Sequence, residues 1–156
     1  MKRILFLLTI CLSALFVQAQ KYEPIKNLLV FNKYKDAKIE LDKQWNDKFT
    51  AKAEAFILKT AIYAGLSMEQ GVKGTPAGEQ LVREADLAFV KYKEMDPALA
   101  LVNDPIYQNG PINIYSSYYN SGYIDYTAKK WEPAFDKFKK AVSYSDLLID
   151  KKVFQQ

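Results

Sequence analysis

The sequence predicts an all-α fold of stacked antiparallel helical hairpins, and two observations support it. Between residues 114 and 148, apolar or small residues recur at intervals of three and four, the spacing of one helical face, whereas a β-strand would need alternation. Pro24, Pro76 and Pro133 lie where a helix tolerates proline, inside a first turn whose N–H groups have no helical partner.

The first 19 residues are typical of a secretory signal peptide. Two basic residues precede an apolar run over residues 4–17, and Val-Gln-Ala at 17–19 is an acceptable cleavage site. The run is too short for a comfortable membrane span, which makes a membrane anchor the weaker alternative. We therefore expect cleavage after Ala19 and export of residues 20–156 as one domain to the periplasm, cell envelope or exterior of a bacterium.

The composition of the exported part excludes several functions. The chain has no histidine, and its single cysteine, Cys11, lies in the signal peptide. Histidine acid–base catalysis, cysteine nucleophiles and ordinary zinc sites are therefore excluded. Without Lys2 and Arg3, the chain has 20 basic and 18 acidic residues. The resulting net charge of about +2 does not indicate binding to nucleic acid.

No pattern of charged or glycine residues indicates catalysis or a cofactor. Acidic residues alternate with lysines at helical spacing, which is typical of a solvated helix face. Residues 71–75, Gly-Val-Lys-Gly-Thr, lack the spacing of a phosphate-binding loop and a preceding strand. We expect no catalytic residue, metal or cofactor. An enzyme would need carboxylates clustered in a pocket with raised pKa values.

The first half of the domain contains one partial and one complete hairpin. Residues 22–47 predict two short helices, the first entered through Pro24. Residues 50–97 predict a longer pair, with Thr50 as N-cap of its first helix. Thr75 caps the second helix, and the glycine-rich residues 67–74 form a loop between the two.

The second half begins with an irregular linker, residues 98–113, that contains an Asn-Gly-Pro turn at 109–111. Its leucines and valine predict that it packs as an extra helical turn. The hairpin of residues 114–148 follows, with its turn near residues 129–132.

In this last hairpin Gly122, Ala134, Phe138 and Ala141 follow one another at intervals of 12, 4 and 3 residues, and Trp131 lies at the turn. The pattern resembles a tetratricopeptide repeat (TPR), whose first helix carries a small residue and whose second carries alanine, a large aromatic and another small residue. Four positions depart from the family pattern: Tyr118, Ser121, Asp125 and Asp146.

The resemblance extends to the preceding hairpins and covers roughly residues 34–148. In residues 50–97 the matching positions are Phe56, Thr60, Tyr63, Ala85, Phe89, Tyr92 and Pro97. In residues 22–47 they are Tyr34, Ala37 and Leu41. After residue 148 no amphipathic helix follows to cap such a stack, so we expect a fragment of a longer family member. An uncapped last hairpin predicts either self-association or marginal stability.

The resemblance implies which side chains face the concave groove of a TPR array. In the last hairpin these are Ser116, Tyr119, Tyr123 and Tyr126, and the corresponding positions in the preceding hairpin are Ile57 and Ala61. Tyrosine rings with few rotatable bonds make good binding anchors. The alternative is that these rings only fill the space between adjacent hairpins.

The function that follows is a non-catalytic binding or scaffolding module of the cell envelope. An extended peptide or a partner protein is the ligand that such an array implies. A second hypothesis is glycan binding, in which exposed tyrosines stack on sugar rings. The sequence does not indicate the identity of the partner.

Overall fold

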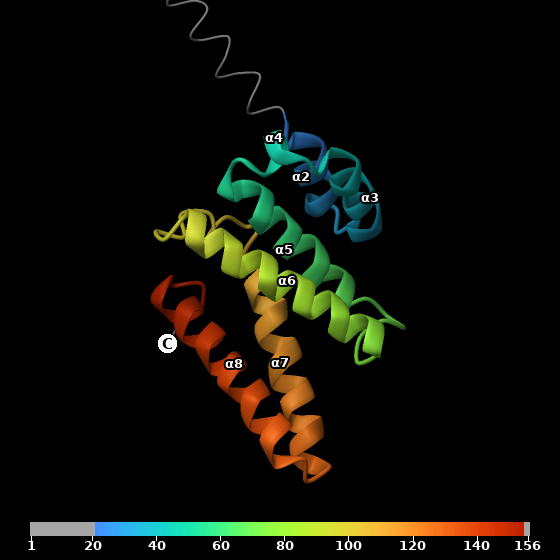
Figure 1. The fold of residues 1–156 in the computed structure, drawn as a ribbon, viewed down its shortest axis with the longest axis vertical. Coiled ribbons are helices and arrows are strands. Elements are labelled where there is room, and N and C mark those ends of the chain that lie inside the picture. The colour runs from blue at the N-terminus through green and yellow to red at the C-terminus, as the bar shows by residue number, and fades with distance from the viewer. Residues whose placement is uncertain (1–20, 155–156) are drawn as a thin grey trace, which may run out of the picture.

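The computed structural model describes residues 21–154, and all regular secondary structure there is helical (Figure 1). The helices are α2 (Glu23–Val30), α3 (Tyr34–Gln44), α4 (Asp47–Thr50), α5 (Ala53–Ser67), α6 (Pro76–Met95), α7 (Asn109–Thr127) and α8 (Trp131–Asp150). The all-α prediction is confirmed. The predicted signal peptide and its cleavage site at Ala19 lie outside the described residues. Within those residues, no helix has the length and apolar character that a membrane crossing requires.

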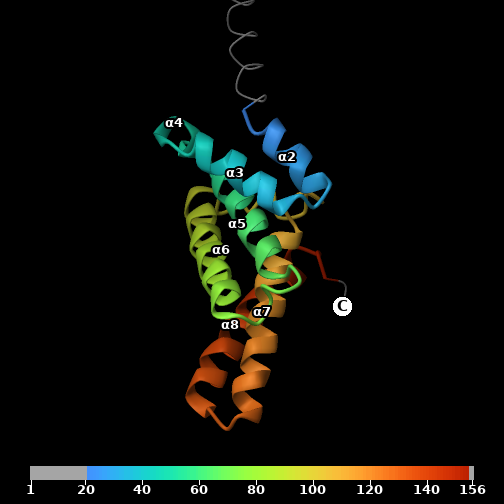
Figure 2. The ribbon, with the colours of Figure 1, turned by 90° about the vertical axis from the view of Figure 1, so that its right-hand side faces the viewer.

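The helices form three hairpins, α2–α3, α5–α6 and α7–α8, with the single-turn helix α4 between the first two. Helix α5 packs against both α2 and α3, and α7 packs against both α5 and α6. The α7–α8 hairpin projects away from the rest of the molecule, and its turn lies at the end farthest from α2–α4 (Figures 1 and 2). This last hairpin therefore has the largest share of surface free of neighbouring helices.

The hydrophobic core lies where α2 to α6, the linker, the start of α7 and the C-terminal part of α8 meet. Its largest fully buried side chains are Tyr22, Tyr92, Tyr107, Phe49, Phe89, Ile25, Leu41, Ile57, Leu58, Ile62, Ile114 and Leu148. By contrast, most of the residues buried in the outer part of the α7–α8 hairpin are small: Gly122, Ala134 and Ala141. The outer part of that hairpin thus holds together by close helix contact and not by a core of large side chains.

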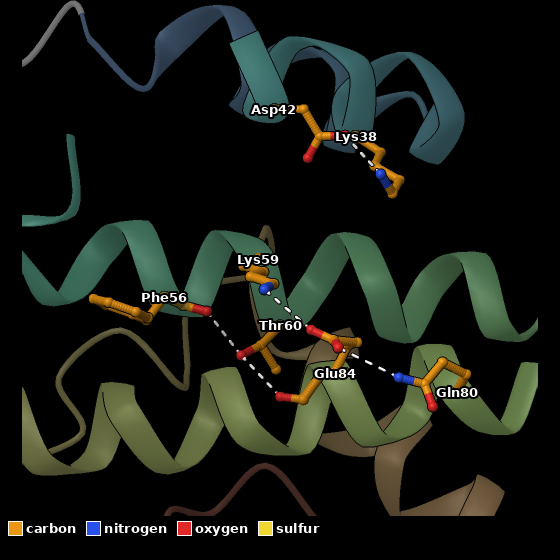
Figure 3. A network of polar contacts seen from close by, with 8 residues as sticks. Lys38, Asp42, Phe56, Lys59, Thr60, Gln80 and Glu84 are labelled. Atoms are coloured by element: carbon orange, nitrogen blue, oxygen red, sulfur yellow. Dashed lines mark hydrogen bonds and ion pairs between the residues drawn. The ribbon is translucent and has the colours of Figure 1, made fainter. Parts of the chain in front are cut away.

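Polar contacts add to the packing of α5 on α6 (Figure 3). The Thr60 hydroxyl, fully buried, donates to the Phe56 carbonyl at 2.8 Å and lies 3.5 Å from the Ala85 carbonyl across the interface. On the surface, Lys59 Nζ lies 3.2 Å from Glu84 Oε2. Because the ion pair is partly solvated, it stabilises the hairpin by less than about 1 kcal/mol, and packing dominates.

Two predicted helix starts differ in outcome. Thr75 caps α6 as predicted, since its Oγ1 accepts a hydrogen bond from the Gly78 N–H at 3.1 Å. Thr50 was the wrong residue for the cap of α5. It is the last residue of α4, which Asn46 caps by accepting from the Phe49 N–H at 3.0 Å, and α5 begins at Ala53. The extra short helix precedes α5 because Asn46 offers its own cap signal there.

The predicted turn at residues 109–111 is also corrected, because these residues form the first turn of α7. Pro111 loses no hydrogen bond there, since the N–H groups of a first helical turn have no partner within the helix. Gly110 is buried against α5, and a Cβ at this position would lie 3.1 Å from Thr60 Cγ2 and 3.2 Å from Ala61 Cα. Its role is close helix approach, and not chain reversal.

The linker between α6 and α7 forms a succession of turns that packs on the core. Val102 is fully buried. The Tyr92 hydroxyl donates to Asp96 Oδ2 and accepts from the Leu101 N–H, both at 2.9 Å. Tyr107, which is 1% exposed, donates to Glu54 Oε1 at 2.7 Å. The linker thus fixes where α7 begins.

Candidate functional site

The three tyrosines predicted to bind a partner lie on one side of α7 and are open to solvent. Tyr119, Tyr123 and Tyr126 are 49%, 57% and 52% exposed, and Ser116, one turn earlier, is half-buried. Ile57 does not join them. It is fully buried in the core, so it is not open to a partner, and the exposed stripe does not continue onto α5.

A second stripe on α8 adjoins the first. Trp131, Phe135 and Val142 are 60%, 66% and 58% exposed, and the half-buried Phe138 lies between the last two along the helix. The sequence analysis named Trp131 and Phe138 only as family positions and did not include this stripe. Its spacing of four, three and four residues is the signal that could have revealed it.

The two stripes meet along one side of the hairpin. The rings of Tyr126 and Trp131 contact edge to face with centroids 5.5 Å apart, and those of Tyr119 and Phe138 are 5.9 Å apart. We call this surface the aromatic face, and it consists of Tyr119, Tyr123, Tyr126, Trp131, Phe135, Phe138 and Val142.

The aromatic face is large for a free surface. Six of its side chains are about half exposed, and an aromatic residue has about 150–250 Å² to bury, so the face exposes on the order of 600 Å². That area equals the largest apolar patches of typical monomers, about 300–600 Å². It also approaches the ~800 Å² that each partner contributes to a standard protein interface.

The last described residues of the chain cover the end of the aromatic face that lies farthest from the α7–α8 turn. The chain reverses at Lys152, whose φ is 58°, and brings Phe154 edge-on to the Tyr115 ring with centroids 5.6 Å apart. Tyr115 in turn stacks on Tyr119 at 6.2 Å. The rings nearer the hairpin turn have no such cover from residues 21–154.

Besides the ring contacts between α7 and α8, close helix approach and an ion pair hold together the hairpin that carries the aromatic face. A Cβ at Gly122 would lie 3.1 Å from the Phe138 ring, so α7 and α8 approach closely there. Lys137 Nζ lies 2.6 Å from Asp125 Oδ2, which joins the two helices, and this hydrogen bond lowers the pKa of Asp125. The exposed tyrosines therefore lie on a helical hairpin that is already folded before a partner binds.

A buried polar cluster fastens this hairpin to α6. The Asp86 carboxylate, 7% exposed, accepts hydrogen bonds from Tyr118 at 2.9 Å, Tyr144 at 2.7 Å and Lys140. Burial alone would raise the pKa of Asp86, but these three hydrogen bonds outweigh it and the pKa is lowered. Burial and the adjacent Asp86 charge raise the pKa values of both tyrosines. The cluster therefore holds an ionised aspartate between neutral tyrosines.

Two hollows of the surface lie beside α6. A pocket of about 230 Å³ lies between the start of α6 and the middle of α7, beside Val82, Arg83 and Tyr118, and a shallower one separates α6 from α8 at Lys93 and Lys140. Asp125 lines the first pocket and Asp86 lines the second, and the pKa of each carboxyl is lowered, the opposite of what a general acid requires. Among the described residues, no cluster of three or more acidic side chains could hold a metal ion.

Comparison with protein-family models gave no match, and comparisons with curated proteins and with solved structures likewise gave no significant match. The TPR resemblance therefore stays a prediction from the sequence.

Proposed function

We propose that this chain is a non-catalytic binding or scaffolding module of the bacterial cell envelope, which binds a peptide or partner protein through the aromatic face of its last hairpin. The observation that carries the proposal is the row of half-exposed rings on α7 and α8. In the proposed TPR-like array of hairpins, this face is the part of the groove that stays open. Export rests on the signal-peptide pattern of residues 1–19.

The chemistry of the aromatic face suits a protein ligand. Tyrosine, tryptophan and phenylalanine are enriched at protein interfaces, where a few of them carry most of the binding energy. Here the rings project from two helices and not from loops. Little conformational entropy is therefore lost when a partner binds.

The test is site-specific crosslinking in the native envelope. A photoreactive residue replaces Tyr123, and a matched control replaces Lys139, which is exposed on α8 outside the aromatic face. We expect one protein to be captured at Tyr123 and not at Lys139. Absence of any captured protein at Tyr123 would contradict the proposal.

Glycan binding is a second candidate, which the exposure of Tyr123 and Trp131 favours because open rings stack on sugars. Under this hypothesis, retention on a polysaccharide column is lost when Tyr119 and Tyr123 are both replaced by alanine. Retention unchanged by the double substitution would rule the hypothesis out.

A further inference from the structure

The pocket between α6 and α7, which we call the α6–α7 pocket, has a volume of about 230 Å³. Its walls come from the loop before α6, the first half of α6 and the middle of α7, with Lys137 of α8 at one side. Both facing helices carry small residues here, Gly78 on α6 and Ser117 and Ser121 on α7. The space between the two helices therefore stays open.

The α6–α7 pocket and the aromatic face lie on opposite sides of α7. Ser121 is two residues away from both Tyr119 and Tyr123, and two residues turn a helix by about 200°. A ligand in the pocket leaves the exposed rings uncovered. A function of this pocket is thus independent of the function proposed for the aromatic face.

The lining of the α6–α7 pocket is largely apolar, and its side chains include Val82, Tyr118 and Ile124. Val82 is buried, and the Tyr118 hydroxyl is fixed by its hydrogen bond to Asp86 at 2.9 Å. An apolar cavity of about 150 Å³ takes up benzene. The α6–α7 pocket is larger, so it has room for one aromatic ring or a short hydrocarbon chain together with a polar group.

The charged side chains of the α6–α7 pocket leave one positive charge in excess. Lys73, Arg83 and Lys137 line the pocket together with Glu79 and Asp125. Lys137 is paired with Asp125 at 2.6 Å. Arg83 lies 3.9 Å from Glu79, and this pair is weak because both side chains are half exposed. Within residues 21–154, Lys73 takes part in no ion pair. The pocket therefore favours an anion.

Arg83 is the side chain best suited to bind that anion. It is the one arginine of residues 20–156, in which every other basic residue is a lysine. Among the described residues its guanidinium donates hydrogen bonds only to Gln80 on the same helix, at 3.1 and 2.8 Å. A guanidinium carries five N–H groups in a planar fork that matches a carboxylate. N–H groups of Arg83 therefore remain for a ligand.

We propose that the α6–α7 pocket binds a small organic acid with one carboxylate. Arg83 holds the carboxylate, Lys73 adds a second positive charge, and an aromatic or short hydrocarbon group lies in the pocket against Val82. A phosphate group suits the pocket less well, because its charge of nearly two exceeds the single positive charge in excess.

The test uses hydrocinnamate, a benzene ring joined to a carboxylate through two methylene groups, and the neutral amide of the same acid as its control. Residues 20–156 are titrated with each compound, and binding is followed by heteronuclear NMR. We expect the amide signals of Gly78, Ser117 and Ser121 to shift, and those of Tyr123 and Trp131 to stay unchanged. The acid should bind about tenfold more tightly than the amide, because it gains a charge-assisted hydrogen bond.

Two variants assign the binding to this pocket. Arg83→Gln removes an exposed charge and should weaken binding of hydrocinnamate about tenfold, without changing the affinity of the neutral amide. Lys91→Gln is the matched control, since Lys91 is exposed on α6 and does not line the pocket. It should leave both affinities unchanged. Ser121→Phe fills the pocket and should abolish binding of both compounds.

Several results would overturn the proposal. They are shifts confined to residues of the aromatic face, equal affinity of the acid and the amide, unchanged affinity in Arg83→Gln, and no binding at millimolar concentration. None of these results affects the capture of a partner at Tyr123, which tests the proposed function separately.

Discussion

Replacing Asp86 with alanine is expected to lower the free energy of unfolding by about 3 kcal/mol. The substitution leaves the Tyr118 and Tyr144 hydroxyls without their acceptor, and a hydrogen bond to a charged group is worth about 1.5–3 kcal/mol. Lys140 adds less, because its side chain is half exposed and its interaction is screened by water. Urea denaturation followed by circular dichroism measures the change.

The matched control for this substitution is Asp136→Ala, which removes an exposed carboxylate from α8. We expect the control to change the free energy of unfolding by less than about 0.5 kcal/mol. Equal stability of the two variants would show that the buried cluster does not fasten the last hairpin to α6.

The same cluster predicts a dependence on acid. Because the pKa of Asp86 is lower in the folded chain than in the unfolded one, its contribution to stability is complete above the unfolded value, about 3.9, and is lost as the pH falls through the folded value. The difference in stability between the wild type and Asp86→Asn should therefore shrink below about pH 4. A difference that grows there would contradict the assigned direction.

Replacing Tyr107 with alanine is expected to cost about 3–5 kcal/mol of stability, the range for truncating a large buried aromatic side chain. Tyr107 is 1% exposed and joins the linker to Glu54 on α5 across 53 residues of sequence. Thermal and urea denaturation check the change. Tyr107→Phe keeps the ring and should cost only about 1–2 kcal/mol. A small effect of the alanine variant would contradict the view that the linker sets the position of α7.

Helical spacing was sufficient to predict the fold class, and local cap and turn signals predicted some of the helix limits. The junction near residues 129–132 matches the observed gap between α7 and α8, and Thr75 caps α6 because its signal is local in sequence. The predicted helix limits were wrong where tertiary contacts determine them. Asn-Gly-Pro at 109–111 has turn chemistry, but Gly110 is required there for close contact with Ala61, which no local pattern reveals.

The candidate site shows the same limit. The spacing of Tyr119, Tyr123 and Tyr126 on one side of a helix was predictable, but the burial of Ile57 depends on the helices packed over α5. The stripe of Trp131 and Phe135 was detectable by periodicity. This stripe meets the tyrosine stripe because of the way α7 and α8 are rotated against each other. The pattern of a single helix gives no information about that rotation.

The central claim is that Tyr123, an exposed ring of the last hairpin, binds a partner and does not stabilise the fold. The most direct test compares Tyr123→Ala with Tyr118→Ala, two tyrosines on the same helix, one exposed and one bonded to Asp86. For each variant, the free energy of unfolding is measured. Capture of the envelope partner is measured separately, with a photoreactive residue in place of Phe135. We predict that Tyr123→Ala keeps its stability within about 0.5 kcal/mol and loses most of the capture, whereas Tyr118→Ala loses about 2 kcal/mol or more. Loss of stability in Tyr123→Ala with capture unchanged would contradict the claim and show that the rings serve the fold.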